Sequence, residues 1–435
     1  MSSILTDSFR IRSLRSKIFY TLALLVITRI GAFIPIPGIN PVVLLNAGPT
    51  SSSALGFLSE YLDFFSGGAF SNFSILMLGV MPYISAQIII QLLLIIVPKL
   101  KDMAKDPAGQ SKLQRWMRYG TILVCIVQSY AVVVYSSEFP GLLTISRPWF
   151  IAVTAITCTA GSMFMVWIGE RITEKGVGNG ISLLIFAGIV ARIPSAVGTL
   201  WRGVSGGTIN IISVAVLLVI FFAVVVMVIY EEKGERRIYV TYSKRIVGRK
   251  IYGAQSSHIP FKLNPSGVIP VIFASAVLSF PLQIAAALGP NVRWLNRFAA
   301  WLSPQGYPYL IVHTILIIAF AFFYTQVTLN PIEISRQIRE NGGTIQGVRA
   351  DNMEEYLTKV LNRIILPGSL FLAFIALLPT IVQLIFHFPS NVAMLLGGTS
   401  LLIMVGVELD TVRSIEGIIK SQNRLMYSGN RSRSL

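Results

Sequence analysis

Apolar residues dominate this chain in ten long runs, each bounded by polar or charged residues. Each run is close to the roughly 20 residues that an α-helix needs to cross a bilayer. The first run carries Arg29 and has no small-residue cleavage site before Pro35, so we interpret it as a span and not as a signal peptide. The predicted spans are 18–37, 74–97, 119–138, 150–169, 181–201, 211–230, 266–289, 308–329, 364–386 and 392–409.

Composition supports the same interpretation. Of the 435 residues, 13% are charged and 54% are hydrophobic, whereas soluble domains have about 25% charged residues. The predicted fold class is therefore an all-α membrane protein with ten transmembrane helices. The remaining segments are a cytoplasmic N-terminal segment, 1–17, and a cytoplasmic C-terminal tail, 410–435.

Basic residues are distributed unevenly between the two sets of alternating loops. Of the 36 Lys and Arg residues, 30 fall in the two terminal segments and in the loops that share their side of the membrane. The alternate loops hold Arg147, Arg192, Arg202, Arg293 and Arg297. Because basic loops stay in the cytoplasm, both termini are predicted to be cytoplasmic. Much of the net charge of +17 is thereby assigned to orientation and to contact with anionic phospholipid, and not to nucleic acid.

Two of the cytoplasmic loops, 231–265 and 330–363, are longer than two helices need to reverse direction. The first contains eight basic residues, among them Lys244, Arg245, Arg249 and Lys250. Such loops indicate either a docking surface or solvated basic segments held by lipid head groups.

Residues that could carry chemistry are sparse. Cys125 and Cys158 lie in apolar runs, and the three histidines are scattered, so the sequence predicts neither a disulfide framework nor a metal site. No Asp or Glu lies in the middle of a predicted span, which disfavours proton- or ion-coupled transport. Nucleotide-binding and hydrolase motifs are absent, so we expect no enzymatic activity and no cofactor.

Ten spans divide into an N-terminal half, 18–201, and a C-terminal half, 211–409, and an odd number of spans in each half requires an inverted repeat. The octets 79–86 and 267–274 match at five of eight positions, each in the second span of its half. We therefore expect two inverted, pseudo-symmetric halves with a path between them.

The segment 56–73 is apolar but interrupted by Glu60, Asp63 and a Gly67-Gly68 pair, so it is poorly suited to spanning lipid. It is either a short re-entrant helix or an amphipathic helix at the outer surface. Arg29 lies well inside the first span. Its side chain either extends to the outer interface or pairs with a carbonyl between helices, and the alternative to both is a direct role in the function.

Several strings along the chain resemble the SecY family of protein-export channels. They include Arg29 to Gly31, Ile34 to Gly38, Phe65 to Ala69 and Gly79 to Gln91. Further strings run over Ile172 to Ser182, Tyr252 to His258 and Gly397 to Ile403. Because these strings occur in the family's order over nearly the whole chain, chance similarity is implausible.

The resemblance implies an hourglass channel with a ring of aliphatic side chains at its waist. The matching positions are Val80, Ile84, Ile181, Ile185, Ile272 and Ile403. Val80 is smaller than the isoleucine common at that position, which puts the tightness of the ring in question. The resemblance also makes 56–73 the plug, including Phe65, Ser66, Gly67 and Gly68, and it places a lateral gate at Ser85, Gln128 and Phe280.

The resemblance further implies partners. Unfolded preproteins and signal sequences would pass through the channel, driven by the SecA ATPase or the ribosome, and small subunits resembling SecE and SecG would accompany it in the bacterial plasma membrane. Lys244, Arg245, Arg249, Lys250 and Arg349 are the implied docking residues for SecA and the ribosome. The alternatives are a secondary transporter of a small solute and a scaffold without a pore.

Overall fold

The computed structural model describes most of the chain. The described residues are 11–40, 63–104, 106–136, 141–242, 245–247, 250–252, 255–288, 294, 297–298, 301–302, 306–386, 392 and 398–431. Its helices are α2 (Arg12–Gly31), α5 (Met81–Ile96), α6 (Pro98–Met103), α7 (Pro107–Ser136), α8 (Arg147–Lys175), α9 (Gly180–Ser205), α10 (Ile211–Lys233), α11 (Ile269–Leu288), α13 (Tyr307–Thr328), α14 (Pro331–Glu340), η2 (Ala350–Asn352), α15 (Met353–Phe386) and α17 (Gly398–Arg431). The strands are β1 (Glu235–Tyr242), β2 (Arg245–Val247), β3 (Lys250–Tyr252), β4 (Gln255–Lys262) and β5 (Gly343–Ile345).

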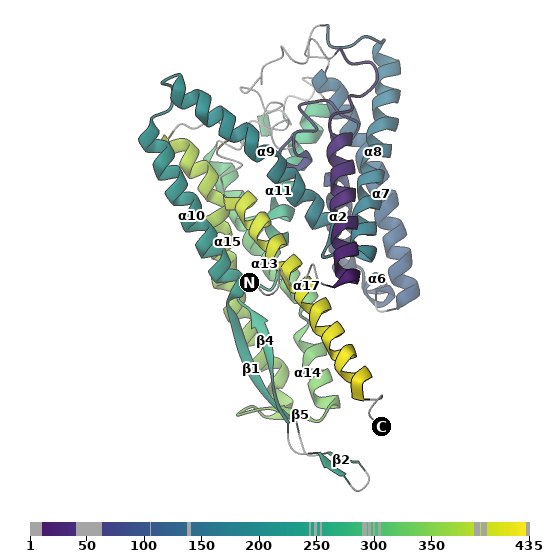
Figure 1. The fold of residues 1–435 in the computed structure, drawn as a ribbon, viewed down its shortest axis with the longest axis vertical. Coiled ribbons are helices and arrows are strands. Elements are labelled where there is room, and N and C mark those ends of the chain that lie inside the picture. The colour runs from purple at the N-terminus through teal and green to yellow at the C-terminus, as the bar shows by residue number, and fades with distance from the viewer. Residues whose placement is uncertain are drawn as a thin grey trace. The chain divides into compact units, whose positions relative to one another are not determined.

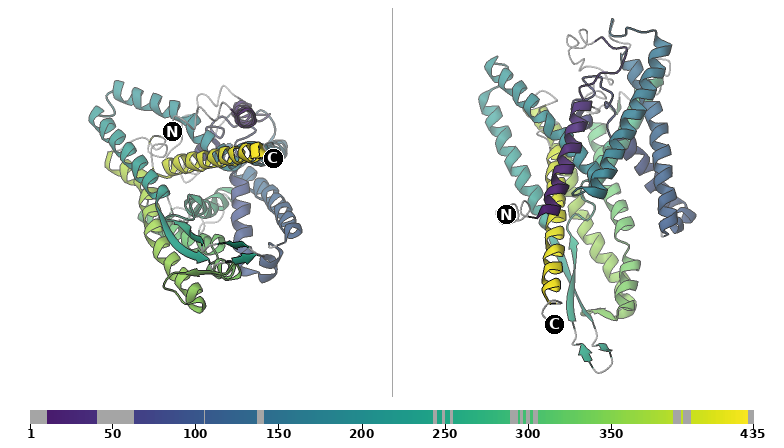
Figure 2. Two further views of the ribbon diagram at one scale, coloured as in Figure 1. Left: turned by 60° about the horizontal axis from the view of Figure 1, so that its bottom comes forward. Right: turned by 45° about the vertical axis from the view of Figure 1, so that its right-hand side comes forward.

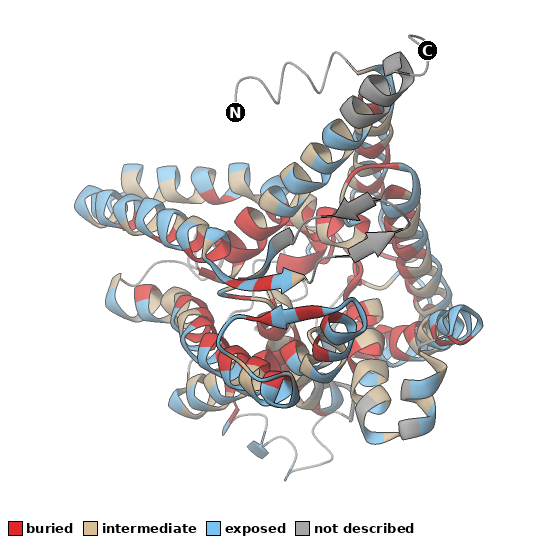
Figure 3. Ribbon diagram, turned by 90° about the horizontal axis from the view of Figure 1, so that it is seen from below, coloured by how far each residue is buried: buried red, intermediate tan, exposed pale blue. Residues whose placement is uncertain are grey.

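Within the described residues, a helix lies at each of the ten predicted spans. Among the described residues, six stretches are long and apolar enough to cross a membrane: Pro107–Val134, Arg147–Lys175, Gly180–Ser205, Ile211–Lys233, Tyr307–Glu340 and Met353–Gln383. Met81–Leu94 and Ile269–Ser279 are apolar but shorter. Many of the apolar side chains on these helices are exposed, as Figure 3 shows by colour, and lipid would cover them.

Several predicted boundaries were wrong. The second span was predicted from residue 74, but α5 begins at Met81, because turns occupy residues 67–80 and Pro82 suits the first turn of a helix. The first helix ends at Gly31, before the two prolines of the next segment, and not at residue 37. The last helix continues from Gly398 to Arg431, so most of the predicted tail is helical.

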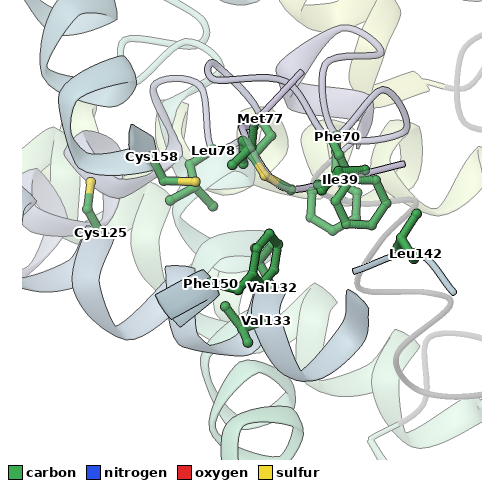
Figure 4. Close-up of a cluster of buried hydrophobic side chains, with 12 residues drawn as sticks. Ile39, Phe70, Met77, Leu78, Cys125, Val132, Val133, Leu142, Phe150 and Cys158 are labelled. Carbon is green, nitrogen blue, oxygen red and sulfur yellow. The ribbon is translucent and has the colours of Figure 1, made fainter. Parts of the chain in front are cut away.

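The chain divides into two compact units. The first comprises Met1–Thr208, Ala276–Gly306 and Ile403–Leu435. Within it, α7 packs against α5 and α8, and α8 also packs against α2 and α9 (Figure 1). One buried core of this unit joins the turns before α5 to α7 and α8, with Phe150 beside Val132 and Val133 (Figure 4). Cys125 and Cys158 belong to this core as free, buried thiols.

The second unit comprises Ile209–Ser275 and Tyr307–Leu402. Here α10 and α13 pack against α15, and the 231–265 segment forms a long antiparallel hairpin of β1 and β4 (Figure 2). Sequence analysis treated this segment only as a loop. Side chains of β1 alternate in burial, with Ile238 and Val240 inside and Tyr239 exposed, as expected for a sheet with one solvated face.

A third strand joins the two long segments, 231–265 and 330–363. From the 330–363 segment, β5 pairs with β1, with Val240 opposite Ile345, so that the strand order is β4-β1-β5. A buried core beneath the sheet includes Ile338 of α14 together with Met353 and Leu357 of α15. Two predicted spans separate the segments 231–265 and 330–363 in the sequence. The two segments nevertheless form one folded element.

Glycines allow close backbone packing inside the first unit. A Cβ atom on Gly161 of α8 would lie 2.0 Å from the carbonyl oxygen of Ile75, and one on Gly180 of α9 would lie 2.0 Å from that of Gly169. Distances this short are impossible for a real side chain, so these positions require glycine. Small residues at helix interfaces commonly serve this purpose in membranes.

We predict that Gly161→Ala destabilises the protein, because the new methyl group would displace the turn at Ile75. The expected loss is about 1–3 kcal/mol, as for other overpacked cores, measured by thermal unfolding in detergent. Gly198→Ala in α9 is the matched control, because a Cβ there meets nothing within 4 Å. The control should be neutral or slightly stabilising, and equal stability of the two variants would contradict the prediction.

Candidate functional site

A compact turn at residues 63–71 is the centre of the site. Residues 63–66 are helical, and Gly67 and Gly68 follow with φ angles of 67° and 90°, which favour glycine. The carboxylate of Asp63 closes the turn, since its Oδ1 accepts hydrogen bonds from the backbone N–H of Ser71 at 2.8 Å and from its hydroxyl at 2.7 Å. The part of the predicted plug from 56 to 62 lies outside the described residues.

This turn lies against two helices of the same unit. A Cβ atom on Gly67 would be 2.6 Å from the Cα of Gly188 in α9, so the two backbones are in close contact. On its other side, Ser66 lies beside Gly79, where a Cβ would be 3.6 Å from the Cα of Ser66. Gly79 directly precedes Val80, and Gly188 lies three residues after Ile185.

Two arginines also hold the turn. From α2, the Nη1 of Arg29 donates to the carbonyl oxygen of Gly67 at 3.1 Å. From α9, the Nη2 of Arg192 forms an ion pair of 2.8 Å with the Oδ2 of Asp63. Of the interpretations left open for Arg29, the structure supports pairing with a carbonyl, which is that of Gly67.

Sequence analysis did not identify these arginines as site residues. It left Arg29 off the site and counted Arg192 with the outer loops, whereas the structure places Arg192 within α9. A charge inside an apolar run was the available signal at both positions, because such a charge is costly without a partner. Only the fold shows that the partner is the turn.

The residues of the first unit that are predicted to form the ring are largely buried. Val80 caps the start of α5 and accepts a backbone hydrogen bond of 3.1 Å from Ile84, so the two lie one helical turn apart as predicted. Val80, Ile84, Ile185 and Ile403 are buried, and Ile181 is half-buried with its Cγ1 near Gly169. Ile272 is half-buried in α11 and belongs to the second unit.

Two of the predicted gate residues lie on neighbouring helices. Ser85 of α5 and Gln128 of α7 are both buried, and these helices pack against each other. Phe280 is in α11, and its side chain lies outside the described residues.

The predicted docking residues that the structure describes lie on the two long segments, 231–265 and 330–363. Arg245 and Lys250 are in β2 and β3, where Arg245 pairs with Tyr252 and Lys250 with Val247. Lys244 and Arg249 lie outside the described residues. Arg349 is exposed at the start of η2, four residues after the end of β5.

The fold and the site define a multi-pass helical membrane protein. Its helices are long and apolar, their exposed apolar side chains suit contact with lipid, and protein surrounds the non-helical turn. A family model described as SecY matches residues 74–412. Protein translocase subunit SecY of Borreliella burgdorferi is 42% identical over 97% of this chain and 96% of its own length. The Escherichia coli K12 protein of that name is 38% identical over 94% of this chain and 92% of its own length. The chain belongs to the SecY family, and the predicted resemblance is confirmed.

Solved structures confirm the fold class. One described as a protein-conducting channel has a TM-score of 0.63 and 23% identity, covering 92% of this chain and 91% of that one. Another, of Sec61 in a canine ribosome–channel complex, has a TM-score of 0.61 and 22% identity, with 92% and 91% coverage.

Proposed function

We propose that this chain is the protein-conducting channel subunit of a Sec translocase, which passes unfolded preproteins across the plasma membrane. Membership of the SecY family supports the general activity. The structural observation that carries the proposal is the position of the 63–71 turn, which packs against Gly79, next to Val80, and against Gly188, three residues after Ile185. A turn at that position is suited to closing a path lined by those residues.

In this proposal, Val80, Ile84, Ile181, Ile185, Ile272 and Ile403 form the constriction. Aliphatic walls exclude water and ions by dewetting, and they offer no hydrogen bonds that would retain a passing polypeptide. Such a constriction selects little by sequence, which suits a channel for many substrates. Phe65, Ser66, Gly67 and Gly68 belong to the plug that covers it at rest.

Hydrophobic signal sequences would leave through the lateral gate at Ser85, Gln128 and Phe280. Ser85 and Gln128 are polar, and interhelical hydrogen bonds in membranes contribute only about 0.6 kcal/mol on average. Contacts of this strength separate readily when a hydrophobic segment competes for the interface.

Energy would come from partners, because the sequence contains no nucleotide-binding motif. We assign docking of the SecA ATPase and the ribosome to the two long segments, with Lys244, Arg245, Arg249 and Lys250 on the first and Arg349 on the second. SecE- and SecG-like subunits and anionic phospholipid complete the complex, in a bacterial plasma membrane with both termini of this chain in the cytoplasm.

We predict that a translocating preprotein crosslinks to cysteines introduced as Ile84→Cys or Ile403→Cys. The measurement uses proteoliposomes with SecA, ATP and a precursor stalled by a folded domain, in a background with Cys125 and Cys158 changed to Ala. Ile156→Cys is the control, because Ile156 is 70% exposed on the apolar surface of α8.

Equal crosslinking at all three positions would contradict a defined path. Saturable uptake of a small solute by this chain alone, without crosslinks, would favour the transporter alternative. Absence of both would favour the scaffold.

We predict that Arg349→Glu lowers SecA-driven export about tenfold, while membrane insertion of the channel itself is unchanged. An exposed guanidinium can bind a carboxylate or phosphate through two hydrogen bonds, and bonds to charged groups contribute about 1.5–3 kcal/mol. The measurement is precursor export and stimulation of SecA ATPase activity. Arg339→Glu, in α14 of the same segment and also exposed, is the control, and wild-type export by Arg349→Glu would refute the assignment.

A further inference from the structure

The carboxylate of Asp63 makes two kinds of contact, one through each oxygen. Its Oδ1 accepts both hydrogen bonds from Ser71 and so holds the turn together. Its Oδ2 pairs with Arg192, which belongs to α9 and not to the turn. The internal order of the turn and its attachment to α9 therefore depend on different atoms.

The ion pair is shielded from solvent. The Asp63 side chain is 8% exposed and that of Arg192 is 22% exposed. Most other ion pairs of the described residues, such as Arg118 with Glu170, have both side chains more than a third exposed, and pairs of that kind contribute little. Removing one partner of a shielded pair leaves an uncompensated charge, so its loss costs more.

The remaining contacts of the turn show why this pair matters for attachment. Gly67 and Gly188 touch through their backbones, so no side chains interlock at that point. Arg29 supplies a second polar contact, from α2 to the carbonyl oxygen of Gly67. The turn is thus held to two helices by two arginines as well as by the buried side chains of Phe64, Phe65 and Phe70, and among the described residues only Arg192 holds it through an opposite charge.

We propose that Asp63 and Arg192 are positioning residues that hold the plug in its closed place and set the free energy needed to open the channel. The inference rests on the proposed function, in which the 63–71 turn is the plug. A substrate opens the channel only if its binding compensates for separating this pair, because a ligand shifts an equilibrium by its differential affinity for the two states. Weakening the pair raises the open population before any substrate arrives.

The test is a double-mutant cycle of Asp63→Asn, Arg192→Gln and the two together. Asparagine keeps a side-chain oxygen for Ser71, so the turn itself should stay closed. Two rates are measured in proteoliposomes without substrate: anion leak, and labelling of Ala69→Cys by a membrane-impermeant maleimide in the background lacking Cys125 and Cys158. Ala69 is 1% exposed in the closed turn, so labelling reports displacement of the plug.

Each single variant should increase both rates about tenfold, which corresponds to about 1.4 kcal/mol. The double variant should be no leakier than the single variants, because the pair is lost once. Arg118→Gln, which removes the exposed pair with Glu170, should leave both rates unchanged. Arg192→Lys keeps the charge, so its leak and labelling rates should stay within about threefold of the wild-type rates. It also serves as the folded comparison if a neutral variant does not fold.

A precursor with a weakened hydrophobic signal should be exported faster by the single variants than by the wild type, since less binding energy is needed to open them. Unchanged leak and labelling in Asp63→Asn and Arg192→Gln, or strictly additive effects in the double variant, would overturn the inference. Normal precursor export by the wild type would then leave the proposed channel function standing. Failure of the wild type to export any precursor with SecA and ATP would instead overturn the function itself.

Discussion

Inside a bilayer every backbone N–H and C=O group needs a partner within the protein, because lipid tails offer none. The spanning helices meet this requirement by themselves, but the described residues between α2 and α5 are mostly turns, apart from the helical residues 63–66. Its described part satisfies backbone groups by other means: Ile36 donates to Phe73 at 2.8 Å, Ile75 donates to Ile34 at 2.9 Å, and Arg29 donates to the carbonyl of Gly67. Irregular backbone is tolerated at this depth only where protein or a water-filled cavity surrounds it.

The same requirement makes this region suitable for movement. A helix that is hydrogen-bonded within itself keeps its bonds wherever it moves, whereas the 63–71 turn is attached through a few contacts to neighbouring helices. Those contacts include backbone packing at Gly188 and polar bonds from two arginines, together with the buried side chains of Phe64, Phe65 and Phe70. Breaking the polar contacts is compatible with reversible opening, in which Phe70 also leaves the buried core that it shares with α7 and α8.

In the segments 231–265 and 330–363, which are predicted to be cytoplasmic, the constraint is different, because water would satisfy the backbone there. The two long segments nevertheless fold into one sheet over a buried core that reaches Met353 and Leu357 of α15. Arg349 follows this sheet and leads directly into α15. A partner that binds there would contact a folded element that is continuous with α15, the helix at a predicted span, and not an isolated loop.

The sequence by itself determined the fold class, the approximate positions of ten helices and the family, because apolar runs of membrane length and long family strings are local features. The orientation of the termini, the two inverted halves and the ring, gate and docking residues remain predictions from charge and resemblance. Only the tertiary structure decided that β5 joins the hairpin, since strand pairing between residues 240 and 345 leaves no local pattern. It also decided the partner of Arg192, which in sequence is one charge inside an apolar run. Its partner Asp63 is 129 positions away, and an ion pair across such a separation depends on how the chain folds back on itself.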